Sequence, residues 1–107
     1  MRYDIVLAPS AVRELQALPA YLRARVRDAL ERHLRHEPTK ANKSRIKRLR
    51  GLSRPQFRLR IDDLRVFYDV TDTAVEVLAI ISKAQAAEWL EERGTEESGG
   101  SSGEGQG

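Results

Sequence analysis

The stretch Phe57-Arg-Leu-Arg-Ile-Asp-Asp-Leu-Arg-Val-Phe-Tyr68 holds two runs of alternating apolar and polar residues, separated by Asp62-Asp63. Alternation with a period of two is typical of β-strands, because successive side chains point to opposite faces. A two-residue turn at Asp62-Asp63 makes the two runs a hairpin. In that hairpin Arg60 lies opposite Arg65, and Arg58 shares their face. We therefore expect three guanidinium groups on one face of an antiparallel sheet.

Like charges directly opposite each other destabilise a sheet, so this arrangement favours a function that requires it. The hairpin ends a longer basic block, Lys40 to Arg65, which holds ten of the nineteen Lys and Arg residues against two acids. Such concentrated positive charge is typical of proteins that bind polyanions. A phosphate backbone is the predicted partner, in preference to a merely solubilising role for the arginines.

The length of 107 residues and the composition predict one folded domain over residues 1–93. Residues 94–107 contain no apolar side chain and are expected to form a disordered Gly/Ser/Glu tail. Before Gly94, Lys and Arg outnumber Asp and Glu by nineteen to thirteen. The absence of cysteine excludes disulfides and thiolate metal sites. With no apolar run of membrane-spanning length and no signal peptide, we expect a cytoplasmic protein without a membrane partner.

The first half of the chain predicts a strand and a helical hairpin. Residues 2–7 alternate and read as a strand, after which Ser10 is a candidate N-cap for a helix that Pro19 ends. A second helix is expected from Tyr21 to His36. Apolar residues recur every four positions along it and give it one apolar face: Leu22, Val26, Leu30 and Leu34.

The second half predicts three consecutive strands and a final helix. A polar loop over residues 39–44 and a basic stretch anchored by Ile46 and Leu49 precede turn residues 51–55. The strands are expected at 56–61, 64–70 and 74–81, and they form an antiparallel meander. The last helix begins at Ser82, where Ser82 and Gln85 match a capping box.

A turn at Asp72-Thr73 would pair the last two strands so that Tyr68 meets Val77 and Val66 meets Ala79. On that register Phe67, Leu78 and Ile80 share the arginine face. These three apolar residues lie either under the final helix or at the docking site of a partner segment. The complete arrangement is a two-layer α+β domain, with the N-terminal strand at an edge of the meander or between its strands, and the helical hairpin covering the apolar face.

Four segments carry a resemblance to a known family: Leu49-Arg-Gly51, Phe57-Arg-Leu-Arg60, Leu64-Arg-Val-Phe-Tyr68 and Val75-Glu-Val-Leu-Ala-Ile-Ile-Ser-Lys83. In this strand order they resemble the RelE/ParE superfamily of type II toxins, over nearly all of residues 1–90. The resemblance implies the β-α-α-β-β-β-α fold and a toxin silenced by a cognate antitoxin. It further implies one of two targets, the mRNA in the ribosome for the RelE branch or DNA gyrase for the ParE branch.

The RelE branch implies a metal-independent endoribonuclease that acts without a cofactor and stops translation. Its active site draws basic residues from the middle strands, which assigns catalytic roles to Arg58, Arg60 and Arg65, with Arg65 as the foremost candidate for contacting the scissile phosphate. Lys83 is a candidate base, because clustered cations favour a neutral amine, and Lys47 is a second candidate. The predicted RNA contacts are Lys43, Arg45, Lys47, Arg48, Arg50 and Trp89.

Two positions depart from the nuclease pattern. Ala84 stands where those enzymes carry an arginine after the last strand, and Leu90 stands where they carry a tyrosine in the last helix. These departures keep open a gyrase inhibitor without catalysis, or an inactive module that only binds an antitoxin.

Two further motifs favour structural roles. Trp89 is expected to pack the last helix onto the body in preference to stacking on a base. His33 and His36 have a spacing that can bind metal, but they lack a third ligand, so we expect no metal site.

Overall fold

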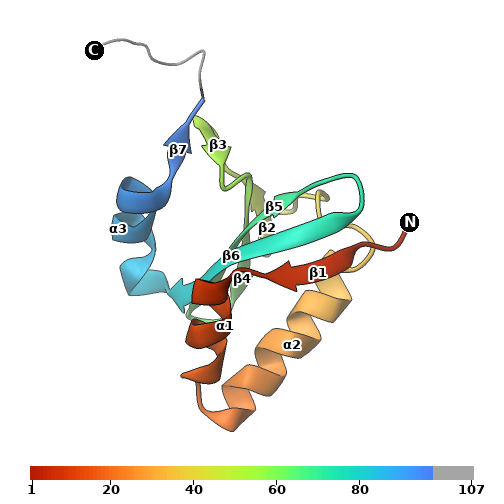
Figure 1. Cartoon of the computed structure of the whole chain (residues 1–107), viewed down its shortest axis with the longest axis vertical. Coiled ribbons are helices and arrows are strands. Elements are labelled where there is room, and N and C mark those ends of the chain that lie inside the picture. Colours follow the sequence, from red (N-terminus) through yellow and green to blue (C-terminus); the bar gives the residue numbers. More distant parts are fainter. Residues whose placement is uncertain (98–107) are drawn as a thin grey trace.

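The computed structural model describes residues 1–97 of the chain, and the predictions made for residues 98–107 lie outside this part. A five-stranded mixed sheet forms its centre, in the order β1-β6-β5-β4-β2 (Figure 1). The elements follow one another as β1 (Asp4–Leu7), α1 (Pro9–Gln16), α2 (Ala20–Leu34), β2 (Ile46–Arg48), β3 (Leu52–Arg54), β4 (Phe57–Ile61), β5 (Leu64–Val70), β6 (Ala74–Ser82), α3 (Lys83–Arg93) and β7 (Thr95–Glu96). No helix of residues 1–97 is long and apolar enough to cross a membrane.

The predicted meander is confirmed, since β4, β5 and β6 pair antiparallel in sequence order. The hairpin register is also confirmed, with Arg60 opposite Arg65 and Ile61 opposite Leu64. Asp62 adopts a positive φ of 51°, a conformation that Asp tolerates better than most residues. The two aspartates are therefore turn formers, as the sequence indicated.

Two further strands flank the meander. β1 lies at one edge, parallel to β6, and β2 lies at the other edge, antiparallel to β4. The sequence predicted β1 but not β2, which appeared only as a basic stretch with two apolar anchors. Three residues are too few to show a strand period, and pairing with β4 makes this segment a strand.

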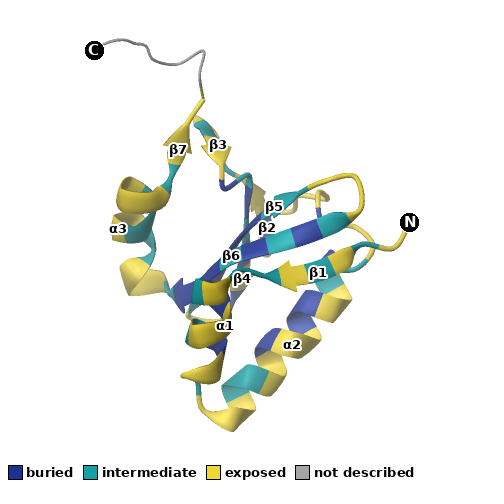
Figure 2. Cartoon of the chain, viewed as in Figure 1, coloured by how far each residue is buried: buried dark blue, intermediate teal, exposed yellow. Residues whose placement is uncertain are grey.

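The apolar face of the sheet is covered by α1 and α2, as predicted, and the α+β fold class is confirmed. Figure 2 shows the buried residues along the central strands and along the inner side of α2. The core on this side comprises Ala11, Leu15, Val26, Ala29, Leu30, Leu34, Ile46, Phe57, Leu59, Ile61, Val66, Tyr68, Val75, Val77 and Ile80. Tyr68 also donates a hydrogen bond of 2.6 Å from its hydroxyl to the Pro38 carbonyl, which satisfies the one polar atom of its buried ring.

The opposite face is partly covered by α3, which packs on Phe67, Ala79 and Ile81 through Ala86, Trp89 and Leu90. The Trp89 ring stacks on Phe67 with centroids 5.0 Å apart, which confirms the packing role expected for this tryptophan. The capping box is present, with the Ser82 hydroxyl accepting from the Gln85 N–H. Phe67 therefore lies under the final helix, which was one of the two positions that the sequence left open for it.

A β-bulge corrects the predicted register between β5 and β6. Tyr68 pairs with Val77 as expected, but Phe67 faces Ala79 and Val66 faces Ile80, because the register shifts by one residue at Leu78. Since a one-residue slip exchanges the two faces of a strand, Ile80 points into the helix-covered core. The prediction that Ile80 shares the arginine face is wrong, and Ala79 and Ile81 occupy that face together with Phe67.

Helix α1 holds the outer edge of this bulge. The Ser10 hydroxyl donates to the Leu78 carbonyl at 3.1 Å, and the Glu14 carboxylate accepts from the Ile80 N–H at 2.8 Å. These side chains continue along β6 after β1 has ended at Leu7, so they replace a strand partner. Ser10 is consequently not the N-cap that the sequence predicted; Ala8 holds that position.

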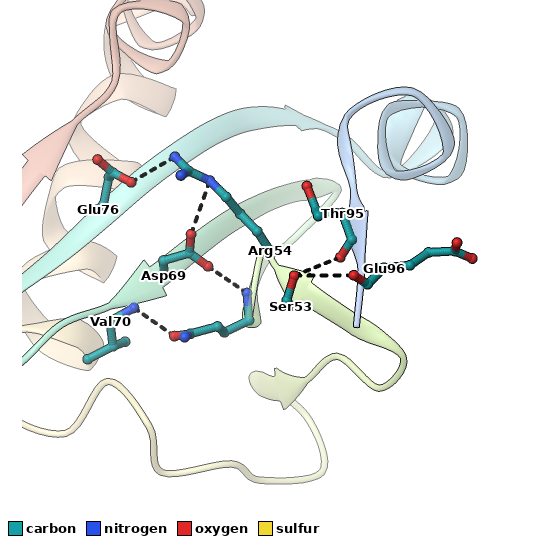
Figure 3. A network of polar contacts seen from close by, with 8 residues as sticks. Ser53, Arg54, Asp69, Val70, Glu76, Thr95 and Glu96 are labelled. Carbon is teal, nitrogen blue, oxygen red and sulfur yellow. Dashed lines mark hydrogen bonds and ion pairs between the residues drawn. The ribbon is translucent and has the colours of Figure 1, made fainter. Parts of the chain in front are cut away.

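A small two-stranded sheet is formed by β3 and β7. Thr95–Glu96, assigned to the disordered tail, pairs with Leu52–Arg54, assigned to a turn. The Ser53 hydroxyl donates to the Thr95 carbonyl at 3.2 Å (Figure 3). Backbone pairing orders these residues, and Leu52 is the one apolar side chain among them, so neither segment showed a hydrophobic period in the sequence.

Candidate nucleic-acid interface

The three hairpin arginines converge on the face of the sheet opposite α1 and α2. Arg60 and Arg65 are direct cross-strand partners, and Arg58 faces Phe67 two pairs further along. Side chains of directly opposed residues share a face. The predicted clustering is therefore confirmed as geometry, although its role in catalysis remains a prediction.

The three side chains differ in how they are held. Arg65 is 8% exposed, and its Nη1 donates to the carbonyls of Asp62 and Leu64 at 2.9 Å each. Arg60 is exposed, and Arg58 is half-buried. Arg65 is thus the buried member of the cluster and is held by two carbonyl groups. Arg58 and Arg60 are more exposed and offer more of their N–H donors to an incoming anion.

The cluster is electrostatically unsatisfied. The Nε of Arg58 is buried without a hydrogen-bond partner in the described residues. Burial is the main cause that lowers the pKa of Arg58, followed by the charges of Arg65 and Arg60. Within residues 1–97, none of the three forms an ion pair with a carboxylate. An anion bound here would neutralise the mutual repulsion of the three guanidinium groups.

Both candidate bases lie beside this cluster. Lys47 is the cross-strand partner of Arg58 on the edge strand β2. Lys83 is the first residue of α3, and its N–H donates to the Asp63 carbonyl at 2.7 Å, so the helix start is attached to the hairpin turn. Both side chains are exposed, and the hairpin therefore has a lysine on each side.

The remaining predicted RNA contacts do not all join the cluster. Arg48 faces Phe57, on the helix-covered side, and its guanidinium lies over that ring at 5.2 Å from the centroid. Arg45 lines a cavity of about 220 Å³ beside α2. Lys43 and Arg50 are exposed, in a loop and in a turn respectively. Arg45 and Arg48 are consequently separated from the three arginines by the edge of the sheet.

The two histidines form no metal site with their surroundings. Burial lowers the pKa of His33, and the nearby charges of Arg45 and Arg32 lower it further. His36 lies with its Nδ1 3.2 Å from the Met1 carbonyl oxygen. Among the residues that the structure describes, no group of three potential ligands could hold a metal ion.

A polar network that the sequence did not reveal joins β3, β5 and β6 through Arg54 (Figure 3). Arg54 pairs with Asp69 at 3.3 Å and with Glu76 at 2.9 Å. Burial raises the pKa of Asp69, although the Gln56 N–H bond and the charge of Arg54 oppose that shift. Strand alternation places Asp69 on the face of Arg65 and Phe67, but its partner Arg54 ends the short strand β3, whose position needs the tertiary structure. These acids limit the positive surface along β5.

Solved structures similar to this fold include two complexes of a RelE-type toxin with its antitoxin. The RelBE2 toxin–antitoxin complex from Mycobacterium tuberculosis matches at 26% identity and a TM-score of 0.58, covering 77% of this chain and 99% of that one. The RelE–RelB complex from the archaeon Pyrococcus horikoshii matches at 28% identity and a TM-score of 0.60, covering 79% and 99%. A YoeB dimer from Staphylococcus aureus, at 14% identity and a TM-score of 0.54, covers 76% and 97% and supports the fold alone.

The sequence itself matches one family. No curated protein matches the chain significantly. Residues 5–87 match the family described as the ParE toxin of the type II toxin–antitoxin system parDE. This match spans β1 through the first half of α3 and includes the whole arginine cluster. The chain therefore belongs to the ParE toxin family, within the RelE/ParE superfamily of type II toxins.

Proposed function

We propose that this toxin is a RelE-like endoribonuclease that cleaves translated mRNA in the cytoplasm, without a metal ion or cofactor. The observation that carries the proposal is the unsatisfied cluster of Arg58, Arg60 and Arg65, in which a buried donor lacks a partner and no carboxylate neutralises the charge. Such a site is arranged for an anion with several oxygens, and a crowded phosphate in the transition state is one.

In this proposal the RNA 2′-hydroxyl attacks the adjacent phosphorus and expels the 5′-oxygen. Arg58 and Arg60 bind the phosphate oxygens. Arg65 stays fixed by its two carbonyl contacts, and its buried positive charge stabilises the bound phosphate electrostatically. Losing one such donor typically lowers the rate ~10²–10³-fold. Lys83 or Lys47 takes the hydroxyl proton, a proton supplied by solvent water converts the departing 5′-oxygen to a hydroxyl, and the ribosome aligns the substrate.

The test adds the purified toxin to a translating extract and maps breaks in the message by primer extension. We expect breaks inside codons that disappear in Arg58→Ala. Arg27→Ala is the matched control, because Arg27 is exposed on α2 and its loss changes the net charge equally. A message that stays intact with the wild-type toxin, while translation continues, would refute the nuclease proposal.

A second candidate is a gyrase inhibitor without catalysis. It is favoured by the ParE description of the matching family and by Ala84 and Leu90, which replace an arginine and a tyrosine of the nuclease pattern. Intact mRNA together with accumulating gyrase-cleaved DNA in the same extract would support this candidate.

The partner proposed for either activity is a cognate antitoxin. Two of the similar structures are toxin–antitoxin complexes, and an antitoxin that covers the arginine cluster would silence both activities.

Salt provides an independent check of the RNA interaction. If the basic surface contacts phosphates, the affinity for RNA should fall steeply as salt rises, and a flat response would contradict those contacts.

A further inference from the structure

The turn at Arg50-Gly51 holds one of the protein's own carboxylates. The Gly51 N–H donates to Glu97 Oε1 at 3.1 Å, and the Glu97 N–H donates back to the Gly51 carbonyl at 3.2 Å. Glu97 directly follows β7. Residues 95–97 include two acids and lie along β3, which is part of the basic block. The C-terminal arm, defined as residues 94–97, thus places a negative charge on the Gly51 amide.

The geometry of this turn suits an anion. Gly51 has a φ of +79°, and a Cβ built on it would meet no atom within 4 Å, so no neighbouring segment crowds the Cα side of this turn. Backbone N–H groups in turns with a left-handed residue are common anion sites. Carboxylate and phosphate oxygens accept the same hydrogen bonds, and the exposed guanidinium of Arg50 is adjacent.

The arm is attached weakly enough to be displaced. β7 has two residues, both exposed, and its pairing with β3 is irregular between Leu52 and Arg54. Fixing each residue loses backbone entropy, and an exposed hydrogen bond gives only a comparable free energy in return. An external anion with more charge than one carboxylate can therefore compete for the Gly51 amide.

We propose that the Gly51 amide and the Arg50 side chain form a phosphate-binding position on the path of the RNA, and that Glu97 occupies it as an internal competitor. The inference rests on the proposed function and extends it along β2, which runs from Lys47, opposite Arg58, towards this turn. Release of the arm admits a nucleic-acid phosphate. Return of the arm lowers the affinity of the free toxin for RNA.

The experiment follows the amide of Gly51 by NMR while inorganic phosphate is added at constant ionic strength. Glu97→Gln keeps the shape of the side chain but removes its charge, and Glu92→Gln on the exposed side of α3 is the control with the same charge change. We expect the NMR resonance of the Gly51 amide to shift as phosphate binds. The phosphate concentration at the midpoint should be about threefold lower in Glu97→Gln than in wild type, because loss of one exposed charge contact typically changes an affinity by a few fold. The Glu92 variant should match wild type.

Equal midpoints in the two variants would show a general charge effect and overturn the competitor role, and a Gly51 amide that never responds would overturn the site. Repeating the titration with a short RNA separates the inference from the proposed function. Response to phosphate but not to RNA would leave an anion site and remove it from the RNA path. Response to both, with no breaks in the translated message, would uphold the phosphate position while refuting the nuclease.

Discussion

Replacing Arg58 by methionine should stabilise the fold and weaken RNA binding at the same time. Methionine keeps the long apolar stem that packs on the sheet, but it removes both the charge and the orphan Nε. The result is a variant in which stability and function change in opposite directions, as expected where a binding site retains unfavourable interactions for its ligand.

The magnitude follows from two contributions. A buried donor without a partner is unfavourable by roughly 1–3 kcal/mol. Arg60 lies two residues along the strand from Arg58, and Arg65 is its diagonal neighbour, which places both charges at about 7 Å. At that separation each repulsion is roughly 0.6 kcal/mol in water and 2.4 kcal/mol near a protein surface. Arg58 is half-buried, so its guanidinium keeps part of its hydration in the folded protein, and the substitution loses this favourable contribution. We therefore expect a net gain in the free energy of unfolding of about 1–2 kcal/mol.

Urea unfolding at low and at moderate salt measures this gain. The free energy of unfolding should rise in Arg58→Met at an unchanged m-value, and the gain should shrink with salt because salt screens the repulsion. Arg60→Met is the control, because its exposed guanidinium is solvated and its removal should stabilise less. Destabilisation of Arg58→Met by more than about 1 kcal/mol would show that the guanidinium is a satisfied structural group and would refute the reasoning.

Three further predictions concern packing, pH and capping. Trp89→Ala should destabilise the protein by about 2–3 kcal/mol, because it removes the stack on Phe67; unchanged urea unfolding would contradict this. Burial raises the pKa of Tyr68, so the folded state retains the proton and stability should fall as pH rises above about 10. Tyr68→Phe should lose that dependence in thermal unfolding. Ser82→Ala should cost about 1 kcal/mol, and hydrogen exchange in α3 should then be faster.

The local patterns were sufficient for the central hairpin and the arginine face. Alternation in 57–68 predicted the register that sets Arg60 opposite Arg65, because a two-residue turn permits only that pairing. The apolar stripe of α2 and the Ser82 capping box were readable for the same reason, since each depends on residues within a few positions of one another.

The bulge in β6 was not readable from its own strand. Ser10 and Glu14 stabilise it from α1, more than sixty residues away in sequence. Without that contact the alternating pattern predicts Ile80 on the arginine face, and with it Ile80 lies in the core. A one-residue shift that depends on a distant side chain leaves no mark on the local hydrophobic period.

By itself, the sequence determined which residues carry the charge and which face of the hairpin presents it, because strand alternation and turn length are local properties. Only the tertiary structure decided which cations join the cluster. It moved Arg45 and Arg48 to the far side of the sheet edge, attached Lys83 to the hairpin turn and placed Glu97 on Gly51. These placements depend on hydrogen bonds and packing between segments distant in the chain, and such contacts have no period that a single sequence can display.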